Sequence, residues 1–246
     1  MSDGLPTIDL LGVRLARLTA DAALTEVERL YELEAPARVF HANAHTLNLA
    51  SVDQGYRDVL NRANLVLNDG KGVMLGARLK GARFPVDLNG NFFTPFVLER
   101  AAAQGWPVFF LGAKPGVAER AAALLETRFE GLKIAGVRDG FFAGRESEVI
   151  EEIQSSGTGL LLVGLGNPKQ EMWLDANLAA TGARLGIGVG AFFDFIAQEI
   201  RRAPAWMNRA GLEWLFRLGL EPRRMWRRYI VGNPAFVVRV VKERSS

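Results

Sequence analysis

Cysteine is absent from the 246-residue chain, and histidine occurs only twice. The lack of cysteine excludes a disulfide framework, a cysteine nucleophile and cysteine-based metal binding, and it fits a reducing cytoplasm. His41 and His45 are four residues apart, but the first lies in a strand-like run, where this spacing does not bring side chains together. Because no third acidic or histidine partner stands at ligand spacing, the sequence argues against a zinc site.

Long apolar runs are absent too. No stretch reaches the roughly 18 uncharged apolar residues that a membrane-spanning helix needs. The first residues, MSDGLPTIDLLGVRLARL, carry acids early and lack the basic start and apolar core of a signal peptide. We therefore expect a cytoplasmic protein, either soluble or peripheral to a membrane.

Two signatures of diphosphate-binding enzymes are also missing. The sequence has no D-x-D pair, which metal-dependent nucleotide-sugar enzymes commonly use to hold a divalent cation against a diphosphate. The first strand-like run of the expected sheet continues into ANAHTL, so no G-x-G-x-x-G dinucleotide fingerprint follows it. We therefore expect neither a metal nor a nicotinamide or flavin cofactor, and any diphosphate would need arginines for neutralisation.

What the sequence does contain is a repeated alternation of strand-like and helix-like segments. Apolar runs of strand length occupy residues 37–43, 64–68, 106–112, 132–137, 159–166 and 184–190. Most are continuous, which is typical of parallel strands covered by helices on both sides. Helix-like segments include residues 53–62, 70–79, 94–104, 116–129, 145–155 and 168–180. The pattern predicts an α/β fold with a doubly wound, Rossmann-like, mostly parallel sheet.

In such a sheet the ligand crevice lies beyond the carboxyl ends of the strands, so the residues just after each run are site candidates. These are Asn43, His45, Asp69, Lys71, Lys114, Asn167, Lys169, Gln170 and Asp194. Glycine-rich turns at the same places could bring backbone N–H groups to a phosphate, through Gly112, Gly166, Gly188 and Gly190. Each turn alone is more typical of a plain connection, but a shared sheet edge favours binding.

Asp69, in NLVLNDGKG, has two interpretations. An aspartate before a helix caps it and favours its dipole. Two glycines follow, and glycine is a poor helix former. The turn is therefore better suited to a close approach of its backbone to another group than to a stable helix start. The residues alone leave both roles open.

Asn167 precedes Pro168, which suits a first helical position, so Asn167 is the predicted N-cap of the next helix. Lys169 and Gln170 then fall in its first turn, at the edge of the sheet. They are either incidental there or hold the hydroxyls of a ligand, and the residues do not decide between the two.

Positive charge is concentrated at the end of the chain. Residues 201–246 hold 11 Lys+Arg against 3 Asp+Glu, or +8, which leaves 19 against 24, or −5, for the first 200 residues. We predict a core domain over 1–200 and a helical, arginine-rich appendage over 201–246. A solvated surface helix is the ordinary interpretation of such charge, but tryptophan beside arginine also suits a membrane interface.

The partners of this appendage follow from the same residues. The α/β body shows no recognisable nucleic-acid module, so we expect no nucleic acid partner. The apolar residues of the tail could pack against the core, against a second subunit in a homo-oligomer, or against lipid. The sequence does not choose among these.

Six stretches resemble, in order, motifs of the bacterial WecG/TagA/CpsF glycosyltransferase family: LNDGKGV, FFLGAKPGVAERAA, LLVGLGNPKQEMW, GVGAFFDFIA, RRAPAWMNRAGLEWLFRL and EPRRMWRRYIVGNP. The resemblance runs from about Val39 through the tail. It implies inverting, metal-independent transfer of a hexosyl or N-acetylhexosaminyl group from a UDP-sugar to a polyprenyl-diphosphate-linked sugar. It places this reaction in surface polysaccharide or teichoic acid assembly, on the inner face of the cytoplasmic membrane.

The resemblance also implies site residues. The family's general base, crevice glutamine and first-strand asparagine match Asp69, Gln170 and Asn43, which we expect to be catalytic. The diphosphate-facing arginines of its appendage match Arg217, Arg224 and Arg227. We expect substrate contacts from these arginines and from His41, Gly112, Lys114, Gly166, Asn167, Lys169, Gly188, Gly190 and Asp194. Asp69 is then expected both to cap its helix and to take a proton from the acceptor.

Two departures from the family pattern concern the substrate. Many members have threonine where this chain has His41, and a GTD turn where it has Gly90, Asn91 and Phe92. Both lie near the expected sugar or acceptor site, so donor and acceptor identity stay open.

Two other functions compete with this one. A nicotinamide- or flavin-dependent oxidoreductase would use the same kind of core, but it predicts the fingerprint that is missing here. A non-enzymatic membrane-binding protein would use the basic tail alone, and it predicts that Asp69 can be replaced without loss of function.

Overall fold

The computed structural model describes residues 4–199, 207, 213–220 and 222–245; of residues 213, 217, 224, 244 and 245 it describes the backbone alone. A six-stranded sheet with the order β4-β3-β8-β7-β5-β6 forms its centre. The strands are β3 (Ala37–Ala42), β4 (Leu65–Asn68), β5 (Pro107–Gly112), β6 (Lys133–Arg138), β7 (Leu160–Gly164) and β8 (Leu185–Gly188). Every pairing in this sheet is parallel, which confirms the predicted α/β fold.

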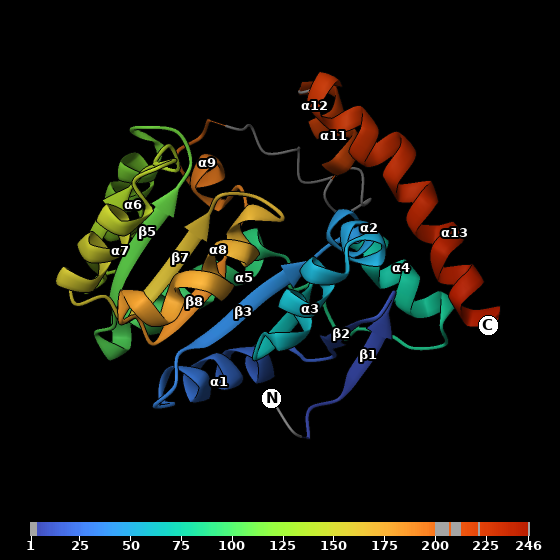
Figure 1. Ribbon diagram of the computed structural model, residues 1–246, viewed down its shortest axis with the longest axis horizontal. Helices are drawn as coiled ribbons and strands as arrows, with labels where there is room; N and C mark the ends of the chain where they lie inside the picture. The colour runs from blue at the N-terminus through green and yellow to red at the C-terminus, as the bar shows by residue number, and fades with distance from the viewer. Residues whose placement is uncertain (1–3, 200–206, 208–212, 221, 246) are drawn as a thin grey trace.

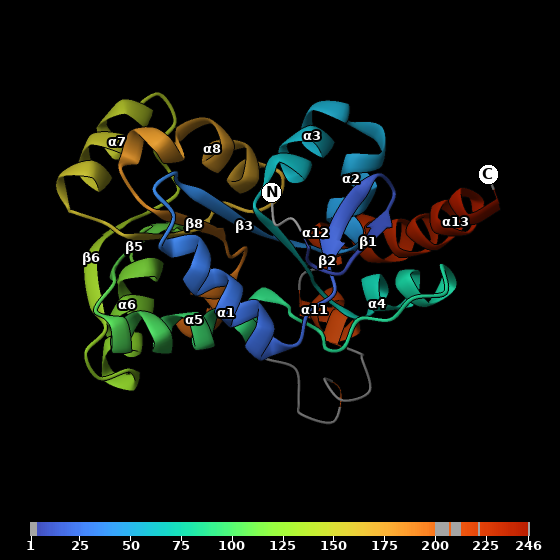
Figure 2. The same ribbon diagram turned by 90° about the horizontal axis from the view of Figure 1, so that it is seen from below.

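Helices cover both faces of the sheet (Figure 2). One face carries α3 (Gln54–Arg62), α7 (Glu146–Ser155), α8 (Lys169–Asn177) and the 3-10 helix η1 (Leu178–Thr181). The other carries α1 (Ala20–Tyr31), α5 (Gly90–Gln104), α6 (Val117–Arg128) and α9 (Phe192–Ile196). Successive residues of a strand point to opposite faces, so Phe109 and Phe110 enter different clusters. The strands are apolar without interruption because both faces are buried.

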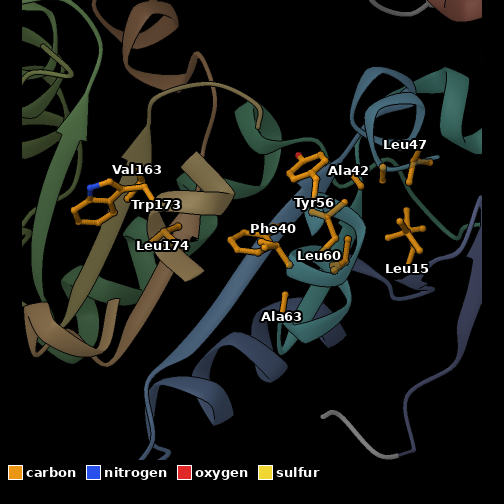
Figure 3. Packing of buried hydrophobic residues seen from close by; sticks show 14 of the residues in the cluster. Leu15, Phe40, Ala42, Leu47, Tyr56, Leu60, Ala63, Val163, Trp173 and Leu174 are labelled. Atoms are coloured by element: carbon orange, nitrogen blue, oxygen red, sulfur yellow. The ribbon is translucent and has the colours of Figure 1, made fainter. Parts of the chain in front are cut away.

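The cluster beneath α3 and α8 supports the part of the sheet that matters for the site. Figure 3 shows Phe40 of β3 and Tyr56 of α3 in this cluster, with Trp173 and Leu174 of α8 farther along the sheet. Phe40 and Leu174 are fully buried. Burial of a side chain of this size stabilises the fold by about 1.5–3 kcal/mol, so these contacts fix α3 and α8 against the strands.

An N-terminal hairpin was not predicted. It pairs β1 (Thr7–Leu10) with β2 (Val13–Ala16) in antiparallel fashion. Leu11 and Gly12 form its two-residue turn with φ of 56° and 78°, the left-handed backbone that such a tight hairpin turn requires. The backbone N–H of Leu11 donates to Oε2 of Glu243 at 3.1 Å, which ties the hairpin to the C-terminal helix.

The described residues after 206 are helical. They form α11 (Glu213–Leu220), α12 (Pro222–Trp226), the π-helix η2 (Arg227–Val231) and α13 (Gly232–Ser245). The α-helical geometry thus changes at Arg227, where the π-helix follows α12. None of the described helices combines the length and the apolar character needed to cross a bilayer.

Helix α13 packs along α2 (Ala44–Val52) and α4 (Lys71–Leu79), as Figure 1 shows. Its Phe236 and Val240 are buried in the same cluster as the core. Gly76 of α4 makes room for this contact, because a Cβ there would lie 2.7 Å from Cζ of Phe236. Asn48 of α2 donates from Nδ2 to the carbonyl of Gly232 at 2.7 Å and accepts from Arg239.

Candidate active site

The carboxyl ends of four neighbouring strands, β4, β3, β8 and β7, bring most of the predicted residues to one edge of the sheet. Asp69 follows β4 and Asn43 follows β3. Gly190 lies just beyond β8, and Asn167 and Gln170 lie beyond β7. Because adjacent parallel strands end side by side, residues far apart in the sequence become neighbours here.

Asp69 is held by the residue that follows the next strand. Nδ2 of Asn43 donates to Oδ2 of Asp69 at 3.1 Å. The other end of the Asn43 amide caps α2, since Oδ1 accepts the backbone N–H groups of His45 and Thr46 at 3.0 and 3.1 Å. The cap therefore fixes which end of the amide faces Asp69.

The expectation that Asp69 caps the following helix is wrong. The N-cap position of α4 is Gly70, with φ of 89°, and no side chain caps this helix. Instead, the backbone N–H of Gly70 donates to Oδ1 of Asp87 at 2.8 Å. The left-handed backbone at Gly70 turns the chain sharply, so the Asp69 carboxylate is left for Asn43.

Asp87 is a second carboxyl group beside Asp69. Burial raises the pKa of Asp87; the Gly70 hydrogen bond opposes this rise, and the negative charge of Asp69 adds to it. Asp87 lies in the segment before α5, which Asn89 caps by accepting the backbone N–H of Phe92 at 3.1 Å. The turn after β4 thus rests on the loop that precedes α5.

His41, in β3, lies between Asp69 and β8. Its Nδ1 is 3.1 Å from the carbonyl oxygen of Gly188, so in the neutral ring Nδ1 carries the proton. Nε2 is buried and has no hydrogen-bond partner among the described residues. Burial lowers the pKa of His41, while the charge of Asp69 and the Gly188 carbonyl oppose the shift. A Cβ at Gly90 would lie 3.8 Å from Nδ1, so His41 adjoins the second departure from the family pattern.

Gln170 bridges the turns that follow β7 and β8. Its Oε1 accepts the backbone N–H of Gly190 at 3.0 Å. Gly188 is required for this approach, because a Cβ there would lie 2.9 Å from Nε2 of Gln170. The side chain of Gln170 is only 2% exposed, so it acts from beneath the turns rather than from solvent.

Glu171, next to Gln170, is fully buried. Its Oε1 accepts Nδ2 of Asn167 at 2.6 Å and Nε2 of Gln170 at 2.7 Å, and its Oε2 accepts the hydroxyl of Tyr56 at 3.0 Å. Burial raises the pKa of Glu171 to about 7, against the opposing effect of these hydrogen bonds. Burial also raises the pKa of Tyr56, and the charge of Glu171 adds to that rise.

Asn167 does not cap α8 as predicted. The N-cap position belongs to Pro168, which follows a cis peptide bond, and no side chain caps the helix. The Asn167 amide donates to Glu171 instead. The helix therefore begins one residue later than expected, and the amide takes part in the buried network around Glu171.

The remaining predicted residues of the core lie around this centre. Gly112 has φ of 135° and lies against β7, where a Cβ would meet the carbonyl oxygen of Gly164 at 2.5 Å. Gly166 has φ of 76° with open space around it. Lys114 and Lys169 are exposed, and Asp194 is half-buried in α9. The carbonyl of Gly166 accepts the backbone N–H of Gln170 at 3.0 Å, whereas Lys114 and Lys169 stay apart from Asn43, Asp69 and Gln170.

The arginines of the appendage are placed only in part. The side chains of Arg217 and Arg224 lie outside the described residues. Arg227 is exposed and its guanidinium lies 5.3 Å from the centroid of the Trp226 ring. Arg228 lies near His45 in the first turn of α2: burial, as the larger cause, and the charge of Arg228 both lower the pKa of His45.

Sequence reasoning missed Tyr56, Glu171, Asp87, Asn48 and Arg228 as site or support residues. Glu171 stood in the quoted motif GNPKQEMW, but an acid in the first turn of a helix is ordinarily exposed and serves the helix dipole. Tyr56 and Asn48 lie in helices after β3 and carry no local signal. A partner that lies more than 100 residues away leaves no trace in local spacing.

Comparison with known proteins finds relatives that match most of this chain. A family model described as "Glycosyl transferase WecG/TagA/CpsF family" matches residues 8–246. The N-acetylglucosaminyldiphosphoundecaprenol N-acetyl-beta-D-mannosaminyltransferase of Bacillus subtilis (strain 168) is 32% identical over 191 residues, which is 78% of this chain and 73% of that protein. The protein of the same name from Bacillus spizizenii is 32% identical over 192 residues, or 78% and 74%. The family match thus includes both the sheet edge and the C-terminal helices.

Proposed function

The chain belongs to the WecG/TagA/CpsF family of glycosyl transferases, and on this premise we propose that it moves a sugar from a UDP-sugar to an acceptor sugar carried on a polyprenyl diphosphate. The observation that carries the proposal is the carboxylate of Asp69, held by Asn43 at the carboxyl edge of two adjacent strands. The UDP donor follows from the motif resemblance of the sequence.

Asp69 is the general base in this proposal. Its carboxylate takes the proton of the attacking acceptor hydroxyl, the acceptor oxygen forms a bond to the anomeric carbon, and the bond from that carbon to the diphosphate oxygen breaks. A single displacement of this kind inverts the anomeric configuration. General-base assistance is worth roughly 10²–10⁴ in rate, and Asn43 keeps the carboxylate in place for it.

The leaving UDP carries negative charge that must be offset. Backbone N–H groups at the turns with Gly166 and Gly190 and arginines of the appendage supply positive potential in this proposal, in place of a metal ion. The absence of a D-x-D pair from the sequence supports the choice of arginine. Arg228, which lies near His45, joins Arg217, Arg224 and Arg227 as a candidate.

The names of the two relatives bear on the substrates. Both are N-acetyl-beta-D-mannosaminyltransferases that act on N-acetylglucosaminyldiphosphoundecaprenol. We assign this chain an acceptor of the same class, a sugar on a polyprenyl diphosphate, and an N-acetylhexosaminyl donor. The buried ring of His41 beside Gly90 is where the donor or acceptor sugar is expected to differ from that of the relatives.

The same proposal places the enzyme on the inner face of the cytoplasmic membrane. Trp226, Ile230 and Val231 are about half-exposed and stand next to Arg227 and Arg228. Apolar and aromatic side chains beside arginines suit an anionic bilayer surface. In flotation with anionic vesicles, Trp226→Ala should lower the bound fraction; equal binding by wild type and variant would contradict this placement.

One experiment tests the reaction. UDP release is measured over a panel of UDP-sugars with a polyprenyl-diphosphate-sugar acceptor, without added metal, for wild type, Asp69→Asn and Asp58→Asn. Asp58 is exposed on α3 and is the matched control. We expect acceptor-dependent release that Asp69→Asn lowers about 100-fold or more and Asp58→Asn leaves unchanged. Near wild-type turnover by Asp69→Asn would refute the assigned base.

A further inference from the structure

Glu171 is the most deeply buried carboxyl group near the site, and the proposed reaction does not use it. It is fully buried, and its three hydrogen bonds come from neutral donors on α3, on α8 and in the turn before α8. No lysine or arginine in the described parts of the chain pairs with it. A carboxylate buried without a cation is costly, and a well-packed apolar side chain would ordinarily be more stable there.

The chemistry of a carboxylate explains what this group does to its neighbours. An ionised carboxylate can only accept hydrogen bonds, so the NH₂ groups of Asn167 and Gln170 must both face Glu171. The oxygen of the Gln170 amide then points the other way, and it accepts the backbone N–H of Gly190 at 3.0 Å. The charge of Glu171 thereby determines the orientation of both amides.

We propose that Glu171 is a positioning residue: as a carboxylate it orients Asn167 and Gln170, and through Gln170 it sets the Gly190 turn against which the donor diphosphate binds. The last clause rests on the proposed function. Protonation would turn one carboxyl oxygen into a donor, so the amides would lose part of their shared acceptor. The turn would then be held less firmly, and transfer would slow as Glu171 takes up its proton.

The neighbouring titratable and charged groups have other partners or stay neutral, so the protonation of Glu171 can change independently of them. Tyr56 of α3 is the titratable group bonded to it, and the raised pKa of Tyr56 keeps that hydroxyl protonated. Asp175, one turn further along α8, pairs with Arg38 of β3 and Arg62 of α3. His41 of β3 bonds to the Gly188 carbonyl instead.

The orientation is tested without any reaction. In ¹⁵N-labelled protein, NMR follows the side-chain amides of Asn167 and Gln170 and the backbone amide of Gly190 as pH changes. We expect these signals to titrate together with a midpoint of about 7 in wild type, and to stay constant in Glu171→Gln. Glu151→Gln, an exposed position on α7, should titrate as wild type does. Signals that do not titrate, or that titrate equally in Glu171→Gln, would overturn the proposal.

Activity supplies a second readout. Glutamine at 171 is neutral and donates from one end of its amide, as the protonated acid does, so Glu171→Gln should lower kcat/KM near pH 8 toward the value that wild type has at acidic pH, and should lose less activity on acidification. Leucine cannot accept, so Glu171→Leu should lower kcat/KM about tenfold or more at every pH. Equal acid sensitivity of wild type and Glu171→Gln would contradict the link to transfer.

Tyr56→Phe is a second variant that tests the same network without removing the carboxyl group, so the proposal stays testable even where Glu171→Leu does not fold. It removes one hydrogen bond to the ionised carboxylate, so the NMR midpoint should move to higher pH rather than vanish. An unchanged midpoint would count against the network. If the NMR signals titrate as expected but no donor and acceptor pair supports transfer by wild type, the proposed function fails while the orienting role of Glu171 stands.

Discussion

The side-chain amide of Asn43 makes two contacts at once: its oxygen caps the N-terminus of helix α2, and its nitrogen lies 3.1 Å from the carboxylate of Asp69. The first residue after β3 thus orients the first residue after β4. Because the cap allows only one orientation of the Asn43 amide, the N-terminus of α2 also fixes the hydrogen bond that holds the proposed base.

Asn43→Ala should therefore impair activity beyond its effect on stability. Loss of the cap should cost about 0.5–2 kcal/mol of unfolding free energy. Asp53→Ala is the matched control, because Asp53 caps α3 by accepting the backbone N–H of Tyr56 at 3.0 Å. Denaturant unfolding should show similar losses for the two variants, whereas turnover should fall about tenfold or more only in Asn43→Ala. Equal turnover in the two would show that the bond to Asp69 is unimportant.

Asp87→Asn should change how stability depends on pH. The folded-state pKa of Asp87 is raised, so its contribution to stability is complete below its unfolded pKa and is lost as pH rises through the folded value. Asparagine keeps an oxygen for the Gly70 N–H and does not titrate. The melting temperature of the variant, relative to wild type, should therefore rise from acidic to neutral pH; a constant difference would contradict the shift.

Glu171→Gln should give the same sign over a different range. The pKa of Glu171 is raised to about 7. The unfolding free energy of wild type should therefore fall as pH rises from the ordinary pKa of a glutamate to about 7, and should stay constant at higher pH. A shift of this size corresponds to roughly 3 kcal/mol at most. Denaturant unfolding at several pH values should show the loss in wild type and not in Glu171→Gln. Parallel pH curves would refute the burial effect.

Gly76→Ala should loosen the C-terminal helix. The new Cβ would lie 2.7 Å from Phe236, and overpacking of this kind costs about 1–3 kcal/mol. Gly219→Ala in α11 is the matched control, since nothing lies within 4 Å of a Cβ there. The control should be neutral or stabilising because alanine favours helices. Limited proteolysis should cut the C-terminal helices faster only in Gly76→Ala; the same digestion of both variants would contradict the contact.

The order of strands and helices could be predicted because it is written in local pattern. Continuous apolar runs marked the buried strands, and the helices between them began within a few residues of their expected positions, α3 at Gln54 instead of 53 and α6 at Val117 instead of 116. The hairpin at residues 7–16 was not predicted because its two four-residue strands, TIDL and VRLA, mix polar with apolar side chains, so they form neither a continuous apolar run nor a periodic pattern long enough to read.

The site was predictable to the level of residues at strand ends, but not to the level of their partners. Doubly wound topology places Asn43 and Asp69 at one edge whatever their side chains do. The cap roles of Asp69 and Asn167 were wrong because other side chains bind these groups: Asn43 binds Asp69 from 26 positions away, and Glu171, four positions away but buried in the core, binds Asn167. Pairings of this kind depend on packing between elements, which local propensity does not contain.

Helix α13 carries a consequence for how the protein is made. The bond from Asn48 to Gly232 spans 184 positions, and that from Leu11 to Glu243 spans 232. During synthesis, the whole sheet and the α2–α4 surface emerge before α13 exists to cover them. Contacts of such long sequence separation form slowly, so in a nascent chain the apolar surface around Gly76 stays uncovered until the last residues have been made. We expect chaperones to act on this enzyme during that interval, by binding the uncovered apolar surface.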